Sequence, residues 1–473
     1  MPQESQSPAN ILWIMADDAS WGDIGCFGSE LIETPNIDRI AAEGCRFTAC
    51  YSGSTVCAPA RSSLMQGLHQ GHATVRNNSS PGGYRHSLQP GDMTVAEVLK
   101  GAGYATGLFG KWGLACWDQP GVPRNMGFDE HVGYLNQRHA HNYYPSFLYH
   151  NGDRMYYPQQ KCHDYQQSNE YDADGNIRPN GVEHPEEAVY SFDVYSQASE
   201  RWLREVAGSG PFFGYLAYTL PHMVLEVPSL GQYADRDWPI EHRIYAAMVT
   251  HMDSAIGRVL DILDETGEAE NTLVIWTSDN GYSHAGFKCE PTLDEFFDHS
   301  GPFKGRKGNL DQGGVRVPTV ARWPGVIEPG RVSNDPWYYP DLMPTAAEIA
   351  DVACPETDGS SLVPLLRGDV EAWDGHEYLY WEHGNAQAVR YEQWFATRPH
   401  PEKPLEIYHA DEDKQQEHDL APDNPELVAQ IEAMIEEAHE PTIYFPEPGQ
   451  PADEWRAEAE AAGLELPENI GRF

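Results

Sequence analysis

Short apolar runs that end in polar or charged residues constrain the fold of this 473-residue chain more than any other feature. They lie at residues 10–16, 104–109, 211–218 and 271–278. Runs of this length without polar alternation are typical of strands buried on both faces of a parallel sheet. Helical signals lie between them, for example the capping box that begins at Thr94. We therefore predict an α/β fold, with a large mixed and mostly parallel sheet sandwiched by helices.

Acidic and amide side chains follow two of these runs directly. Asp17 and Asp18 end the first run, and Asp279 and Asn280 end the last. In open α/β sheets ligands bind at the carboxyl ends of the strands, so these side chains are expected to share one site. Adjacent carboxylates repel each other unless a cation neutralises them, and oxygen ligands suit Ca²⁺, or less well Mg²⁺, rather than zinc. The alternative for the Asp pair is a solvated turn.

Another candidate site residue is Cys57. Residues 57–67 are predicted to form a turn that leads into a short helix. A cysteine at a helix start lies where backbone N–H groups and the helix dipole favour negative charge. Arg61 follows one helical turn later and can turn back toward that charge, and Pro59 suits the first turn. A buried cysteine without a chemical role is the alternative.

Three further side chains are candidates because of where they lie. Lys111 and His222 follow predicted strands, and Lys307 belongs to a glycine-containing basic stretch at residues 301–322. Glycine lets the backbone approach a ligand closely. The pKa of histidine lies near neutral pH, which suits His222 to proton transfer. The alternatives are a surface lysine, a structural histidine and a solvated run of charges.

The stretch from Cys57 to Gly67, with C-x-P-x-R at its start, resembles the signature of the formylglycine-dependent sulfatases, in the alkaline phosphatase superfamily. Residues 110–115, 305–318 and 358–366 resemble further motifs of that family, and the resemblance extends from residue 10 to about residue 421. It implies that Cys57 is oxidised to formylglycine by a formylglycine-generating enzyme or an anaerobic sulfatase-maturating enzyme.

The resemblance also implies one bound calcium ion per chain. Its expected ligands are Asp17, Asp18, Cys57, Asp279 and Asn280. The implied reaction is hydrolysis of a sulfate ester, and we expect a sulfated carbohydrate as the substrate. In the family the hydrated aldehyde of formylglycine attacks sulfur, the alcohol departs with a proton from a histidine, and the aldehyde re-forms as sulfate leaves.

Catalytic roles are expected for a set of basic residues around the nucleophile, because fixed cations balance the charge of a transferring anion. The expected catalytic residues are Cys57, Arg61, Lys111, His141, His222 and Lys307. The expected substrate-binding residues are Lys111, His139, His141, His222 and Lys307.

One position departs from the family pattern. Gly113 stands in G-K-W-G-L-A where the family has G-K-W-H-L-G, and the missing histidine contacts formylglycine in the family. We expect His141, and after it His139, to take over this role from the loop at residues 137–144. The alternative is a pair of surface histidines that stack on tyrosines. The irregular segment 145–187 is assigned to substrate recognition.

The hydrophobic pattern changes after Gly368. Short alternating runs and a helical stretch at residues 425–438 predict a small antiparallel α+β subdomain. We therefore divide the chain into a catalytic α/β domain at residues 1–368, the subdomain at 369–445 and an extended tail at 446–473.

The net charge and the hydropathy of the sequence limit the kinds of partner that we expect. The formal net charge is −42, which disfavours nucleic acid because a basic footprint is missing. No apolar run is long enough to span a membrane. The first ten residues lack the pattern of a secretory signal, so we expect a cytoplasmic protein, or a periplasmic or secreted one if a signal was removed.

Two other functions stay open at this point. One is a phosphonate monoester or phosphodiester hydrolase that uses the same formylglycine. The other is a sulfated-glycan binder without catalysis, which Gly113 motivates. The sequence predicts neither the sugar nor the sulfated position.

Overall fold

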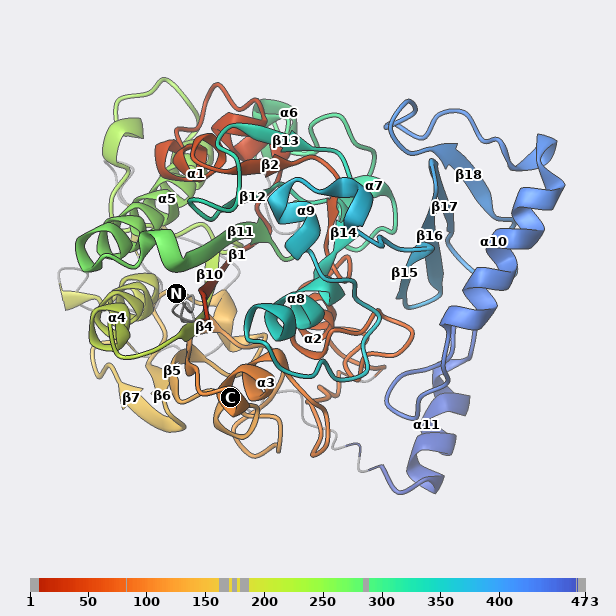
Figure 1. Ribbon diagram of the computed structural model, residues 1–473, viewed down its shortest axis with the longest axis horizontal. Helices are drawn as coiled ribbons and strands as arrows, with labels where there is room; N and C mark the ends of the chain where they lie inside the picture. The colour runs from red at the N-terminus through yellow and green to blue at the C-terminus, as the bar shows by residue number, and fades with distance from the viewer. Residues whose placement is uncertain are drawn as a thin grey trace, which may run out of the picture.

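A sheet of ten strands forms the centre of the larger part of the molecule (Figure 1). The computed structural model describes residues 8–81, 83–160, 170–171, 177–178, 187–283, 289–464 and 466. In spatial order the strands are β13 (Arg331–Ser333), β2 (Cys45–Phe47), β12 (Thr319–Arg322), β11 (Thr272–Ser278), β1 (Asn10–Asp17), β10 (Phe212–Pro221), β4 (Ala105–Lys111), β5 (Glu130–Tyr134), β6 (Phe147–His150) and β7 (Asp153–Tyr156). The predicted α/β fold class is confirmed.

The middle of this sheet is parallel. Strands β11, β1, β10, β4 and β5 run in one direction, whereas β12 and β6 pair antiparallel to its two sides. All eight residues of β1 are buried, as expected for an apolar strand with neighbours on both sides. Trp13 pairs with Tyr215 on β10 and with Ile275 on β11, so the three strands end near the same level.

Helices cover both faces of the sheet (Figure 1). Leu12 and Ile14 face a layer made by α1 (Pro35–Ala42), α4 (Ser191–Val206) and α5 (Ile240–Thr266). Ile11 and Trp13 face the layer of α2 (Cys57–Gln66), α3 (Val95–Gly101), α8 (Leu342–Ile349) and α9 (Val363–Arg367). The short helices α6 (Leu293–Phe297) and α7 (Gln312–Val315) lie in connections. The alternation of side chains along one strand thus builds two cores.

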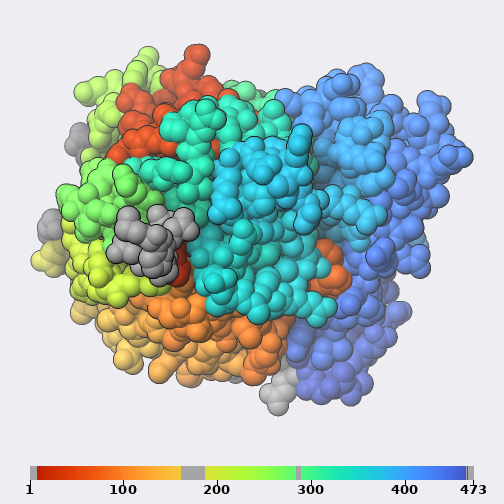
Figure 2. Space-filling view, in the orientation of Figure 1, coloured from red at the N-terminus to blue at the C-terminus, as the bar shows by residue number. Residues whose placement is uncertain are grey.

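A second, separate sheet follows in the C-terminal part. Its antiparallel strands are β15 (Tyr378–His383), β16 (Ala386–Tyr391), β17 (Trp394–Arg398) and β18 (Glu406–His409). Helix α10 (Pro425–Ala438) packs on it through Ile431 and Ile435, which contact the cluster around Val389. Figure 2 shows these C-terminal segments, in blue, along one side of the molecule. The predicted small antiparallel sheet with its helix is therefore present.

Two expectations about irregular segments are wrong. The stretch from residue 446 does not stay extended, because residues Ala452–Ala461 form α11. Trp455 anchors this helix: its side chain is buried, and its indole N–H donates to the carbonyl of Ile443 at 3.1 Å. The segment 145–187 begins with the β6–β7 hairpin, which extends the main sheet, and it contains a short pair of strands, β8 (Glu170–Tyr171) and β9 (Ile177–Arg178). The remainder of that segment falls largely outside the described residues, so its assignment to substrate recognition stays a prediction.

Among the residues that the structure describes, every helix is too short or too polar to cross a lipid bilayer.

Candidate active site

The carboxyl ends of four parallel strands meet at one place. Asp17 ends β1 and Lys111 ends β4, whereas His222 and Asp279 are the first residues after β10 and β11. Asp18 adopts a left-handed backbone conformation with φ 67°, which turns the chain sharply after β1. Its backbone N–H donates to Asp279 Oδ1 at 3.2 Å, so the ends of two neighbouring strands are joined.

Cys57 enters this site from the helix layer. It is the first residue of α2, and all ten residues of that helix are buried. The Cys57 Sγ lies 3.3 Å from Asp17 Oδ1 and 3.1 Å from Lys307 Nζ. Helix α2 ends at Gly67, whose φ of 69° supplies the left-handed cap. The signature stretch thus directs its first side chain at the strand ends.

Arg61 crosses from α2 to the sheet. Its Nη2 donates to Asp279 Oδ2 at 2.8 Å, and its Nη1 donates to the carbonyl of Lys111 at 2.7 Å. The Asp17 Oδ2 atom lies 3.7 Å from Arg61 Nη2. A fully buried guanidinium requires such partners, because an unpaired charge is costly to bury.

Two lysines complete the ring of cations. Lys111 Nζ donates to Asp17 Oδ2 at 2.6 Å, and Lys307 Nζ donates to Asp18 Oδ1 at the same distance. The loop that carries Lys307 is fixed at both sides: the Lys307 backbone N–H donates to Tyr282, and that of Gly308 donates to Thr55. Each lysine is therefore placed opposite one carboxylate of the adjacent Asp pair.

The ring of His222 is oriented by the backbone. Its Nδ1 lies 2.5 Å from the carbonyl of Met223, so Nδ1 carries a proton and donates it. This leaves Nε2 to face the site, 3.4 Å from Asp18 Oδ2. Burial lowers the pKa of His222 to about 4, and Asp18 opposes part of that shift. Without a ligand His222 is thus neutral at pH 7, and a bound anion would raise its pKa.

The electrostatics of the site are those of closely packed opposite charges. Burial alone would raise the pKa of Asp17, but Lys111, His222, Arg61 and Lys307 hold it well below its ordinary value. Burial and the neighbouring Asp17 raise the pKa of Asp279. Burial, Asp17 and Asp279 raise the pKa of the Cys57 thiol to about 12, so the unmodified side chain is not a thiolate.

Two buried oxygens in the site fit a cation. Asp18 Oδ2 and Asn280 Oδ1 accept no hydrogen bond from the described residues, although their residues are joined by an Asn280 Nδ2 donation to Asp18 Oδ1 at 2.7 Å. Ligand atoms of Asp17, Asp18, Cys57 and His222 lie within 4.8 Å of one another. Unpartnered carboxylate and amide oxygens are ligands that Ca²⁺ accepts.

Comparison with known proteins identifies the family. The model of the sulfatase family matches residues 9–352, and the model of the C-terminal region of N-sulphoglucosamine sulphohydrolase matches residues 307–439. The chain is a member of the sulfatase family. Sulfatases hydrolyse sulfate esters, and the predicted family and enzyme class are confirmed.

Relatives and a solved structure agree with this assignment. The sulfatase is 30% identical to the steryl-sulfatase of Mus musculus over 81% of its own length and 69% of the relative. It is 32% identical to the N-acetylgalactosamine-6-sulfatase of Canis lupus familiaris, over 76% of its own length and 66% of the relative. The structure of Ps i-CgsB matches with a TM-score of 0.76 and 25% identity, over 96% and 98% of the two chains, and this protein is also known in complex with k-i-k-neocarrahexaose.

The two candidate histidines of the sulfatase lie in different surroundings. The ring of His141 stacks on that of His222, with 4.1 Å between centroids and 20° between planes. His139 packs against Tyr134 and Phe147 with centroid distances of 5.0 and 4.6 Å, in an aromatic cluster beside β5 and β6. The geometry therefore places His141 at the strand ends and gives His139 the surroundings of a core residue.

Gln137 is a site residue that the sequence did not indicate. A Cβ atom at Gly113, where φ is +80°, would lie 3.1 Å from Gln137 Oε1 and 3.5 Å from Arg61 Cδ. Both polar atoms of the buried Gln137 amide have no hydrogen-bond partner among the described residues. The amide thus occupies the space beside Gly113, and only packing, not its place in a polar loop, distinguishes it from its neighbours.

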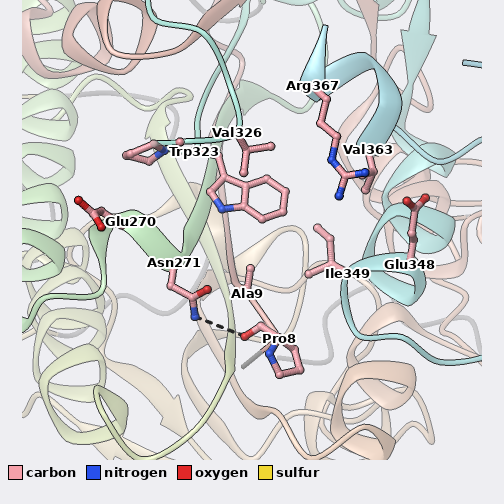
Figure 3. Close-up of a pocket in the computed structure, with 12 residues that line it drawn as sticks. Pro8, Ala9, Glu270, Asn271, Trp323, Val326, Glu348, Ile349, Val363 and Arg367 are labelled. Carbon is pink, nitrogen blue, oxygen red and sulfur yellow. Dashed lines mark hydrogen bonds between the residues drawn. The ribbon is translucent and has the colours of Figure 1, made fainter. Parts of the chain in front are cut away.

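The site opens into a cavity of about 530 Å³ that is lined by His141, His222, Lys307 and Gln137. A larger cavity, of about 840 Å³, lies at the opposite ends of β1 and β11 (Figure 3). Its walls include Trp323, and Figure 3 shows the Asn271 amide bonded to the Pro8 carbonyl there. Cavity size alone would have selected the wrong end of the sheet.

Proposed function

We propose that this sulfatase hydrolyses a sulfate ester of a saccharide, with formylglycine at position 57 and one calcium ion. The observation that carries the proposal is the position of the Cys57 Sγ, 3.3 Å from Asp17 and 3.1 Å from Lys307. A saccharide is supported by the relative named N-acetylgalactosamine-6-sulfatase and by the Ps i-CgsB complex. The polar and cationic lining of the cavity supports it as well.

The residues present fit both groups. Asp17, Asp18, Asp279, Asn280 and residue 57 would hold the calcium ion. Bound calcium polarises an oxygen ligand, and formylglycine supplies a nucleophilic oxygen in place of the neutral thiol. We also propose that a formylglycine-generating or anaerobic sulfatase-maturating enzyme acts on the chain, because the C-x-P-x-R sequence at residues 57–61 is intact.

The fixed charges of the chain bind and orient the sulfate group. Arg61, Lys111 and Lys307 are paired with the carboxylates of Asp279, Asp17 and Asp18, so the side chains alone are close to electroneutral. A divalent cation would make the site positive, and the single negative charge of a sulfate ester would offset part of that charge. Binding of the cation is therefore expected to increase the affinity for the sulfate group, and binding of the sulfate group to increase the affinity for the cation.

Proton transfer is assigned to His222. Its Nδ1 proton is bound to the Met223 carbonyl, so the proton that moves is at Nε2. The negative charge of a bound sulfate would favour protonation there, and the protonated ring could then donate to the departing alcohol oxygen. The Tyr143 hydroxyl lies 2.7 Å from the carbonyls of Thr219 and His222 and holds this segment in place. His141 keeps the ring in its plane by stacking.

The test begins with protein produced together with a formylglycine-generating enzyme. A peptide mass across residues 57–61 shows whether the thiol has been replaced by the aldehyde. Turnover is then compared for nitrophenyl sulfate, an aryl phosphonate and a panel of sulfated saccharides, with Cys57→Ala as the control. We expect sulfate release that depends on the aldehyde and exceeds phosphonate turnover. Faster turnover of the phosphonate, or full conversion without release of sulfate from any substrate, would contradict the proposal.

A further inference from the structure

The mouth of the active-site cavity is cationic in an otherwise acidic protein. The chain has 73 acidic and 31 basic residues, yet among the residues that the structure describes no aspartate or glutamate lines this cavity. The positively charged residues that line it are Arg85, Arg138, Arg306 and Lys307. A concentration of one sign of charge against the mean charge of the protein indicates an anionic ligand.

The neighbouring cavity shows that this charge is local. That cavity measures about 480 Å³ and shares Arg306 and Asn309 with the active-site cavity. Its lining contains three acidic residues, Asp294, Glu295 and Asp298. Acidic side chains are thus present one cavity away, and Arg306 stands at the boundary between the two.

Arg306 differs from Lys307 in what its charge already contacts. Lys307 is paired with Asp18 and lies beside Cys57, inside the strand-end site. The half-buried Arg306 side chain makes no hydrogen bond or ion pair with any described residue. Its backbone is fixed nonetheless, because its carbonyl accepts from Asn309 and the adjacent Lys307 N–H donates to Tyr282. A fixed backbone with an uncommitted guanidinium suits ligand binding.

We propose that Arg306, with Arg138 and Arg85 from two other segments that line the cavity, binds a second anionic group of the substrate. This inference rests on the proposed function. The substrate is then a saccharide with at least two anionic groups: the sulfate that is hydrolysed at residue 57, and a sulfate or carboxylate held at the mouth. An arginine suits this task because its planar fork pairs with both oxygens of such a group.

A general attraction of anions is the competing explanation. In that case the arginines would raise the association rate of every anion, and their effect would be similar for substrates with one and with two anionic groups. A binding site for the second group instead acts only on ligands that carry it. Comparison of matched ligands separates the two.

The experiment measures inhibition of nitrophenyl sulfate hydrolysis by matched pairs of monosulfated and disulfated galactose, glucosamine and N-acetylgalactosamine. The ratio of the two inhibition constants is determined within each variant, so that general changes in activity cancel. For at least one sugar, we expect the wild type to bind the disulfated member about 10-fold or more tightly, the effect of a charge-assisted hydrogen bond. Arg306→Gln should remove most of this ratio, and Arg306→Lys should restore part of it.

Arg124→Gln is the matched control, because Arg124 is exposed and its loss changes the net charge equally. Equal inhibition by both members of every pair in the wild type would overturn the proposal, as would an unchanged ratio in Arg306→Gln. Failure of the wild type to hydrolyse the aryl sulfate would count against the proposed function instead. Calorimetry would then measure the dissociation constants of the same pairs, and their ratio in the wild type and in Arg306→Gln would test the second anion site.

Discussion

Two buried networks of charged side chains in this molecule differ in whether their hydrogen bonds are complete. The strand-end cluster contains Asp17, Asp18, Cys57, Arg61, Lys111, His222, Asp279, Asn280 and Lys307. The Glu382 cluster contains Arg76, Tyr380, Glu382, His439 and Glu447, and it joins the chain after α2 to the C-terminal sheet and the segment after α10.

The Glu382 cluster is closed. Glu382 Oε1 lies 3.2 Å from Arg76 Nη1, and Oε2 accepts from His439 at 2.6 Å and from the Tyr380 hydroxyl at 2.9 Å. The other ring nitrogen of His439 contacts Glu447. Every charged group of this cluster has a partner of opposite charge within the protein, which is what a structural network requires.

The strand-end cluster is open. Asp18 Oδ2 and Asn280 Oδ1 lack hydrogen-bond donors among the described residues, and the Cys57 Sγ lies beside Asp17 and Lys307. Such a network gains less stability from its charges than a closed one, but it has free ligand positions. The comparison indicates that the Glu382 cluster stabilises the fold, whereas the strand-end cluster serves ligand binding. It predicts that substitutions in the two clusters have opposite effects on stability and turnover.

The largest effect is expected for Cys57→Ala. Turnover of nitrophenyl sulfate should fall by at least about 10³-fold, because the nucleophile is lost. The free energy of unfolding should change by less than about 1.5 kcal/mol, since a single neutral side chain is shortened. Steady-state kinetics and urea unfolding of the same preparation measure both. A variant that unfolds readily, or retains turnover, would break the distinction between the clusters.

The next largest effect is expected for Lys111→Met. It should lower kcat/KM for the aryl sulfate by about 10²- to 10³-fold, because one fixed cation beside the transferring group is removed. Lys100→Met is the matched control: Lys100 is 2.6 Å from Asp129, but both side chains are nearly half exposed. A similar loss of kcat/KM in both variants would point to net charge rather than to position.

In the Glu382 cluster, Arg76→Met should act on stability. Removal of one partner leaves buried charge uncompensated, and the free energy of unfolding should fall by about 3 kcal/mol. Turnover per folded molecule should stay close to that of the wild type. Arg204→Met, in the exposed pair of Arg204 with Glu265, should cost less than about 0.5 kcal/mol in the same urea titration. An Arg76→Met variant as stable as the wild type would show that the closed network does not hold the two parts together.

A smaller effect is expected from pH. Hydrogen bonds with Glu382 and Glu447 raise the pKa of His439 from 6.5 to about 8, although burial opposes them. Because the folded pKa exceeds the unfolded one, this stabilisation is complete below pH 6.5 and is lost as the pH rises through about 8. The loss is at most about 2 kcal/mol. Urea titrations between about pH 6 and 9 should show a fall in the free energy of unfolding of the wild type that is absent in His439→Gln. The same pH dependence of this free energy in both proteins would contradict the prediction.

Local patterns in the sequence predicted the strands and the residues at their ends. Each parallel strand is a single apolar run, so Asp17 and Asp279 could be assigned to one site although they are far apart in the chain. The same reasoning could not find Gln137 or the Glu382 cluster. Their positions depend on packing between distant segments: Gln137 and His439 lie in connections that carry no periodic signal, and the place of Glu382 in β15 does not indicate its partners.

The predictions for the two irregular segments were wrong for a related reason. Helix α11 is held by the buried side chains of Trp455 and Ala459, but they lie in a stretch whose proline and glutamate content indicated an extended tail. The β6–β7 hairpin is an edge of the sheet with exposed residues, so its alternation is weak. The choice between His139 and His141 needed the structure, because two side chains that are two positions apart in a loop can lie in different surroundings.

The central claim is that the open cluster holds one calcium ion between Asp17, Asp18, Asp279 and Asn280. Its most direct test is the calcium content of the purified protein by plasma mass spectrometry, after equilibration with calcium and exhaustive dialysis. We predict one calcium per chain in the wild type and in the acidic control Asp294→Asn, and its loss in the double variant Asp18→Ala, Asp279→Ala, with the fold verified by circular dichroism. A wild type without calcium, or a double variant that retains one ion per chain, would contradict the account.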